Sequence, residues 1–129
     1  MGRVTLGGVN AVQVINPDLN RVVAQMATGP SPHIAQHFAG TALGVVVVQG
    51  PGELMLFDPA TLKPTRSVAV GRQPHWVDIL PDGKKVLVTD EGSNDVSMVD
   101  LAGGQTATIA VGAAPRKVAV QHAAMQRRP

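Results

Sequence analysis

Three short segments of the chain place a glycine and a proline just before a side chain that could bind a ligand. A histidine follows the last proline in two of them and an arginine in the third: Gly29-Pro30-Ser31-Pro32-His33, Gly71-Arg72-Gln73-Pro74-His75 and Gly112-Ala113-Ala114-Pro115-Arg116. Imidazoles can bind a metal or an anion, and a guanidinium binds carboxylates and phosphates. Trp76, the only tryptophan, comes directly after His75. We therefore take His33, His75, Trp76 and Arg116 as candidate ligand-binding residues.

Each of these residues also has a plain structural role open to it. The imidazole nitrogens of His33 and His75 could hydrogen-bond to the backbone of the segment that precedes them, and the indole ring could pack in a core. The third repeat carries Arg116, which does not ligate metals, and His33 and His37 would lie about 13 Å apart on one side of a strand. We expect no metal site here.

Other reaction chemistry finds little support in the sequence. With no cysteine, disulfides, thiolate metal sites and covalently attached c-type haem are excluded. There is no Gly-x-Ser-x-Gly elbow, His-Glu-x-x-His motif or phosphate-binding loop. The acidic residues fall where turns and strand ends are expected, and aspartate caps local backbone there. We predict no catalytic residue and no cofactor.

The candidate residues belong to a longer repeat of about 42 residues. A valine, a glycine and an Asx residue recur in one register along the chain: Val4, Val46 and Val88; Gly8, Gly50 and Gly92; Asn16, Asp58 and Asp100. The glycine-proline segments recur at steps of 42 and 41 residues. A shared period of this length is typical of a repeat architecture.

Within each repeat the apolar residues alternate with period two, which predicts strands. In the clearest copy we expect strands at 76–80, 86–89, 96–100 and 106–111, separated by turns such as Pro81-Asp82-Gly83-Lys84. Four antiparallel strands in about 42 residues match one blade of a β-propeller. The prolines suit the first residue of a strand, where no ladder hydrogen bond is donated. The histidines should then begin the innermost strands, near one mouth of a central channel.

Composition limits the remaining classes. Apolar residues make up 44% of the chain but aromatic residues only 2%, so the core must be aliphatic. The net charge is +2 and the basic residues are scattered, which argues against a nucleic-acid binder. The longest apolar run, Val45 to Val48, is too short to span a bilayer. No export signal precedes the first expected strand.

The segment Val88-Thr89-Asp90-Glu91-Gly92-Ser93-Asn94-Asp95-Val96-Ser97-Met98-Val99-Asp100 resembles the YVTN β-propeller repeat, as do Pro74-His75-Trp76-Val77 and Ile109-Ala110-Val111-Gly112. The chain departs from that family in lacking the tyrosine. The resemblance implies a periplasmic or extracellular setting. Related propellers include the haem-binding domain of cytochrome-type nitrite reductase, quinoprotein amine dehydrogenase subunits and a seven-bladed lactonase class, so the fold alone does not decide activity.

The prediction is therefore an all-β chain of about three four-stranded blades that form an incomplete ring. We expect the propeller segment at residues 1–121, with blade boundaries near 1–32, 33–74 and 75–115, the first strand of a next or closing blade at 116–121, and a basic tail at 122–129. Closed rings need at least four blades. The missing partner is either the remaining blades of a longer propeller or a second copy that closes a six-bladed ring.

For function the sequence favours a non-catalytic binding or scaffolding segment whose ligand is a protein, a surface polymer or a small molecule. The alternative is a fragment of a periplasmic propeller enzyme, either a redox enzyme of the haem or quinoprotein dehydrogenase kind or a lactonase.

Overall fold

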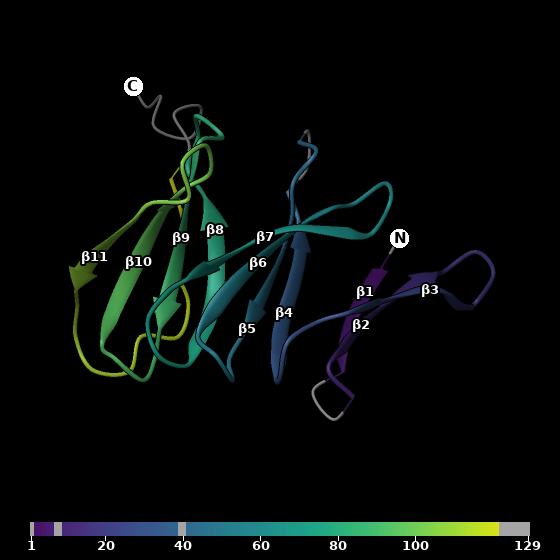
Figure 1. The fold of residues 1–129 in the computed structure, drawn as a ribbon, viewed down its shortest axis with the longest axis horizontal. Coiled ribbons are helices and arrows are strands. Elements are labelled where there is room, and N and C mark those ends of the chain that lie inside the picture. The colour runs from purple at the N-terminus through teal and green to yellow at the C-terminus, as the bar shows by residue number, and fades with distance from the viewer. Residues whose placement is uncertain (1, 7–8, 39–40, 122–129) are drawn as a thin grey trace, which may run out of the picture.

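The computed structural model describes residues 2–6, 9–38 and 41–121 of the chain. Its strands form three antiparallel sheets, which follow one another along the long axis of the molecule (Figure 1). The first holds β1 (Gly2–Leu6), β2 (Ala11–Asn16) and β3 (Arg21–Ala27). The second holds β4 (Pro32–His37), β5 (Gly44–Val48), β6 (Glu53–Asp58) and β7 (Lys63–Ala69). The third holds β8 (Pro74–Ile79), β9 (Lys85–Asp90), β10 (Asp95–Asp100) and β11 (Thr106–Ala110).

The prediction of an all-β propeller segment with antiparallel four-stranded units is confirmed, and the sheets do not close into a ring. The first sheet has three strands because β1 corresponds to the second strand of each later unit: it lies one repeat before β5 and two before β9. Pro32 and Pro74 begin β4 and β8, as expected. No helix capable of crossing a membrane is found among the described residues.

The segment at 116–121 differs from expectation. Residues 115–121 are not part of any of the three sheets, although the sequence predicts a strand there. A strand is stabilised by ladder hydrogen bonds to a neighbour, and no second strand of a following blade lies among the described residues. The predicted basic tail, 122–129, lies outside the described residues.

The backbone itself repeats with the period read from the sequence. Left-handed φ angles recur at three equivalent sets of turn positions, near +50° to +72°: Asn10, Gly52 and Asn94; Asn20, Leu62 and Gly104; Ser31, Gln73 and Ala114. The Asx residues of the repeat cap turns, because Asn16, Asp58 and Asp100 each accept a backbone N–H from two residues onward, at 2.8–2.9 Å. The repeat is thus one of turn geometry as well as of side chains.

The two central strands of the middle sheet, β5 and β6, are buried on both faces, and this holds the three sheets together. Alternate side chains of β5 and β6 point to opposite faces. Those on one face pack against the third sheet: Val45, Val47, Leu54 and Leu56. Those on the other face pack against the first sheet: Val46, Val48, Met55 and Phe57. The unbroken valine run is therefore explained by a strand with neighbours on both sides.

Gly44 is required by the packing of this middle sheet. It lies opposite Phe57 in the β5–β6 ladder, and a Cβ atom there would stand 2.4 Å from the phenyl ring. We expect Gly44→Ala to lower the free energy of unfolding by about 1–3 kcal/mol, the range for overpacking in a core, as measured by urea denaturation. A Cβ at Gly112 would meet nothing within 4 Å, so Gly112→Ala is the control. Equal stability of the two variants would contradict the packing described here.

Candidate functional site

The two candidate histidines, His33 and His75, occupy β-bulges at the start of their strands. The β4–β5 register shifts between Pro32 and Ile34, and the β8–β9 register shifts between Pro74 and Trp76. His33 and His75 are the residues left out of the ladder. A bulge redirects the side chain that it carries, and the two imidazole centroids lie 4.4 Å apart at a tilt of 48°. Adjacent blades thus bring these two histidines together.

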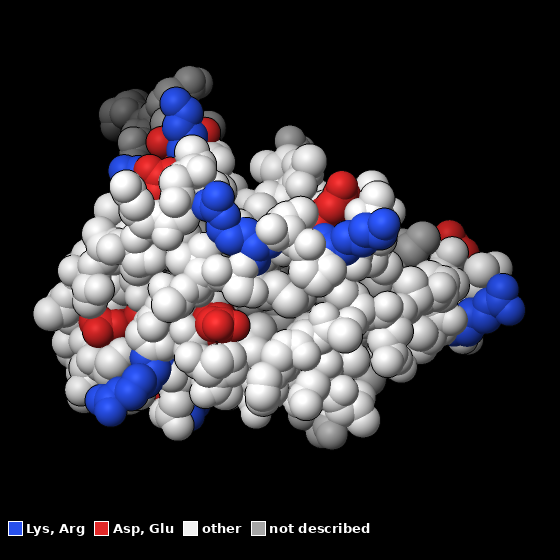
Figure 2. All heavy atoms as spheres, viewed as in Figure 1, with Lys and Arg blue, Asp and Glu red and all other residues white. Residues whose placement is uncertain are grey.

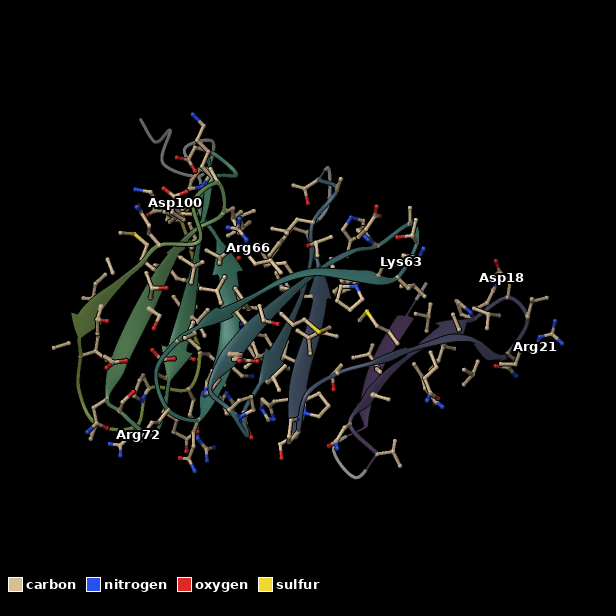
Figure 3. The ribbon with its side chains drawn as sticks, viewed as in Figure 1. Asp18, Arg21, Lys63, Arg66, Arg72 and Asp100 are labelled. Carbon is tan, nitrogen blue, oxygen red and sulfur yellow. The ribbon has the colours of Figure 1, made fainter. Side chains whose placement is uncertain are left out.

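The glycine of the repeat makes this arrangement possible. Gly50 and Gly92 donate backbone hydrogen bonds to the loops that lead into β4 and β8, to Pro30 O at 3.1 Å and Arg72 O at 2.9 Å. A Cβ at Gly50 would stand 2.8 Å from Pro30 O. These loops lie at the strand ends that Arg72 marks in Figure 3, while Asp100 marks the opposite strand ends. We call this side of the molecule, with His33, His75, Trp76, Glu91, Arg116 and Lys117, the crossing-loop edge.

Arg116 joins the histidines through its backbone. His75 Nδ1 lies 2.8 Å from Arg116 O, and because a carbonyl only accepts, Nδ1 carries the hydrogen. Thr89 Oγ1 donates to the same oxygen at 2.9 Å and accepts from the Trp76 N–H at 3.0 Å. The third glycine-proline segment is therefore held against the third sheet by His75, which belongs to the second glycine-proline segment, and by Thr89 of β9.

Two cationic side chains extend from this edge. Arg116 Nε lies 3.7 Å from Glu91 Oε2, with the arginine side chain 71% exposed, so solvent weakens that ion pair. Lys117 Nζ stands 4.8 Å from the centroid of the Trp76 ring, a cation–π distance. Trp76 is half-buried and lies outside both core clusters between the sheets. Its ring faces the segment that follows β11.

The electrostatics of the histidine pair favour a neutral His33. Partial burial lowers the pKa of His33, and the neighbouring His75 lowers it further, while Glu91 acts in the opposite direction. His37, by contrast, lies at the far end of β4, where its Nε2 is 2.7 Å from Thr41 O. Among the described residues, no group of three or more histidine, aspartate or glutamate side chains is placed to hold a metal ion.

A buried carboxyl group beneath the edge escaped the sequence analysis. Asp90 ends β9 with no exposed surface, and its Oδ2 accepts from Ser97 Oγ at 2.6 Å. Its Oδ1 has no hydrogen-bond partner among the described residues. Burial and the Asp95 carboxyl group raise the pKa of Asp90 to about 7, against the lowering effects of Ser97 and the Gly71 backbone. One signal was available: the repeat places an apolar residue, Val48, at the equivalent position.

Comparisons with known proteins identify the fold. Comparison with protein-family models finds no match, and no curated protein matches. Solved structures do match, and they are β-propeller-like proteins. A Kuenenia stuttgartiensis hydrazine synthase shares 19% identity at a TM-score of 0.76 over 84% of this chain and 32% of its own. The dihydro-heme d1 dehydrogenase NirN, in complex with DHE, shares 18% identity at a TM-score of 0.73 over 93% of this chain and 27% of its own.

A functionally unknown protein from Desulfotomaculum acetoxidans is similar at 13% identity, with a TM-score of 0.75 over 85% of this chain and 36% of its own. The chain therefore spans about a third of the length of the structures that it resembles. At these identities the likeness shows the propeller fold.

The raised pKa of Asp90 predicts a pH-dependent stability. The folded state holds a proton on Asp90 that the unfolded chain releases near pH 3.8. The contribution of Asp90 to the free energy of unfolding is therefore greatest below that pH and is lost as the pH rises to about 7. We expect Asp90→Asn, which cannot ionise, to remove a slope of up to about 1.4 kcal/mol per pH unit. Urea denaturation from pH 4 to pH 8 measures it.

The control for this test is Asp18→Asn, on an exposed turn. The lowered pKa of His33 has the opposite effect on stability, because its contribution falls as the pH drops below the usual histidine pKa of 6.5. This effect is the same in the parent chain and in each variant. Parallel pH profiles for the parent chain and Asp90→Asn would contradict the assignment.

Proposed function

We propose that this chain is a non-catalytic, ligand-binding segment of a β-propeller of the YVTN repeat type, and that its ligand binds at the crossing-loop edge. One observation carries the proposal. His33 and His75 lie in van der Waals range of each other, His75 contacts the backbone of Arg116, and Trp76 lies beside Lys117. Residues spread over more than 80 positions of the sequence thus converge at one edge.

The chemistry of this edge favours an anionic ligand. Arg116 and Lys117 are both exposed, and Glu91 is the one carboxylate found in an ion pair with them among the described residues. A neutral imidazole can add a hydrogen bond to such a ligand, and the indole ring offers a flat apolar surface beside it. A carboxylate or phosphate group, carried by a protein or a surface polymer, meets these requirements. No cofactor is needed for this function.

The setting proposed for this function is outside the cytoplasm, as the resemblance to the YVTN repeat implies. Nucleic acid is not proposed as a partner. Charged side chains are dispersed among uncharged ones on the face drawn in Figure 2, without a continuous basic patch. The remaining blades of the ring are supplied either by a longer chain or by a further copy, since closed propellers have at least four blades.

A second candidate function is a part of a propeller redox enzyme. Two structures that the chain resembles are named as a hydrazine synthase and a dihydro-heme d1 dehydrogenase, and a single imidazole, that of His33 or of His75, is a ligand of a kind that haem iron accepts. Nothing comparable favours the lactonase alternative.

Trp76 reports on the proposed site because it is the only tryptophan of the chain. We expect citrate and inorganic phosphate to change its fluorescence in a saturable manner. Arg116→Ala should weaken the apparent affinity by about tenfold, the loss expected for one charge-assisted hydrogen bond. Arg21→Ala removes an exposed arginine at the other end of the molecule (Figure 3) and should have no effect. Equal losses in the two variants would show nonspecific attraction and contradict the proposal.

The redox alternative predicts a different result. Addition of haemin to the purified chain should then give a shifted Soret band that is lost in His33→Ala or in His75→Ala, whichever residue supplies the iron ligand, while His37→Ala retains it. An unshifted band, together with saturable binding of citrate or phosphate, would leave the ligand-binding function as the better account.

A further inference from the structure

The face of the third sheet that points away from the middle sheet has the pattern of a blade interface. Val77, Val86, Val88 and Val99 pack toward the middle sheet, so strand alternation turns their neighbours to the opposite face. Leu87, Val96 and Met98 on that face are the repeat equivalents of Val45, Leu54 and Leu56. Val45, Leu54 and Leu56 are buried under the third sheet, whereas Leu87, Val96 and Met98 are only half-buried and Ile109 is 46% exposed.

The segment 116–121 already lies on this face, where the first strand of a further blade would stand. Arg116 O accepts hydrogen bonds from His75 and Thr89, and Val120 N donates to Asp78 Oδ2 at 2.9 Å. Val118 and Val120 are in repeat register with Val77 and Ile79 of β8. The segment therefore has the sequence and the place of a first strand, and it has no ladder partner among the described residues.

In the part of the chain that the structure describes, the first sheet lacks the first strand that the other two sheets have. Its strand order is β1-β2-β3, with β1 at the end. In the other two sheets, the strand equivalent to β1 pairs with a first strand: β5 with β4, and β9 with β8. The free edge of β1 thus presents backbone N–H and C=O groups at the position where a first strand belongs. An edge of this kind accepts an added strand.

We propose that two copies of this chain assemble head to tail into a six-bladed ring, in which residues 116–121 of each copy form the first strand of the other copy's first sheet. The first and third sheets lie at opposite ends of the molecule, with the middle sheet between them (Figure 1). One chain therefore does not close on itself. Six blades lie within the range of known propellers, and a two-fold axis satisfies both junctions at once. The inference is independent of the proposed ligand.

The internal repeats give the register of the new junction. Val77 pairs with Val88 in the third sheet and Ala35 with Val46 in the second. The same offset places Val118 of one copy opposite Val4 of the other. Directly opposed residues in an antiparallel pair lie close enough for a disulfide, and the chain has no cysteine of its own to interfere.

The mass in solution is the first test. Size-exclusion chromatography with light scattering should give twice the chain mass of 13.4 kDa. Val118→Pro removes a ladder donor and blocks pairing, so it should give the single-chain mass with an unchanged β-type circular dichroism spectrum. Val118→Ile, which keeps the N–H group and the strand preference, should retain the double mass. A parent chain of single mass would overturn the proposal and favour blades supplied by a longer polypeptide.

The cross-link test does not depend on the folding of the proline variant. The double variant Val4→Cys, Val118→Cys should oxidise to a covalent two-chain product on a non-reducing gel, while neither single variant should do so. A cross-link within one chain, seen as faster migration at single-chain mass, would show that the segment pairs with its own first sheet. That outcome, or the absence of any cross-link, would overturn the proposal.

Discussion

The burial of β5 on both faces is the interaction on which the rest of the structure depends. Its valines alternate between two interfaces, so this one strand sets the positions of the first and third sheets relative to each other. With only 2% aromatic residues, the interfaces are formed by valine, leucine and methionine, apart from Phe38 and Phe57. Small aliphatic side chains allow the sheets and the loops between them to approach closely, and Gly44 and Gly50 mark the places where even a methyl group would not fit.

The candidate site follows from this close approach. Each loop between blades is held by backbone hydrogen bonds to the turn beside it, and the strand that follows starts with a proline and then a bulge. The bulge frees His33 and His75 from the ladder, and the spacing of adjacent blades brings their rings together. The site is therefore a product of the repeat: one loop, copied along the chain, places equivalent side chains side by side.

The third repeat has diverged in ways that bear on function. Where the middle sheet has Val48, the third has Asp90, whose carboxyl group is buried beside Asp95 with a raised pKa. Its first strand carries Trp76 and Asp78, which contact residues 116–121. A polar group in a buried position has a cost in stability, and here it lies beneath the edge where the candidate ligand-binding residues gather. The similar structures share the fold at low identity, so the chemistry of this edge has to be inferred from the residues of this chain.

The sequence by itself determined the fold class, the period and the turns, because valine alternation, glycine, proline and Asx residues act through local backbone preferences. It also picked out His33, His75 and Arg116 at one position of the repeat and Trp76 at the next position. Only the tertiary structure decided that the two imidazoles meet, that the Arg116 carbonyl accepts a hydrogen bond from the imidazole of His75 and that Asp90 is buried. It also showed that 116–121 has no ladder partner among the described residues. These facts depend on the spacing between blades and on a register shift at each bulge. A sequence pattern gives the spacing of repeated residues along the chain, but it does not give the distance in space between the sheets that carry them.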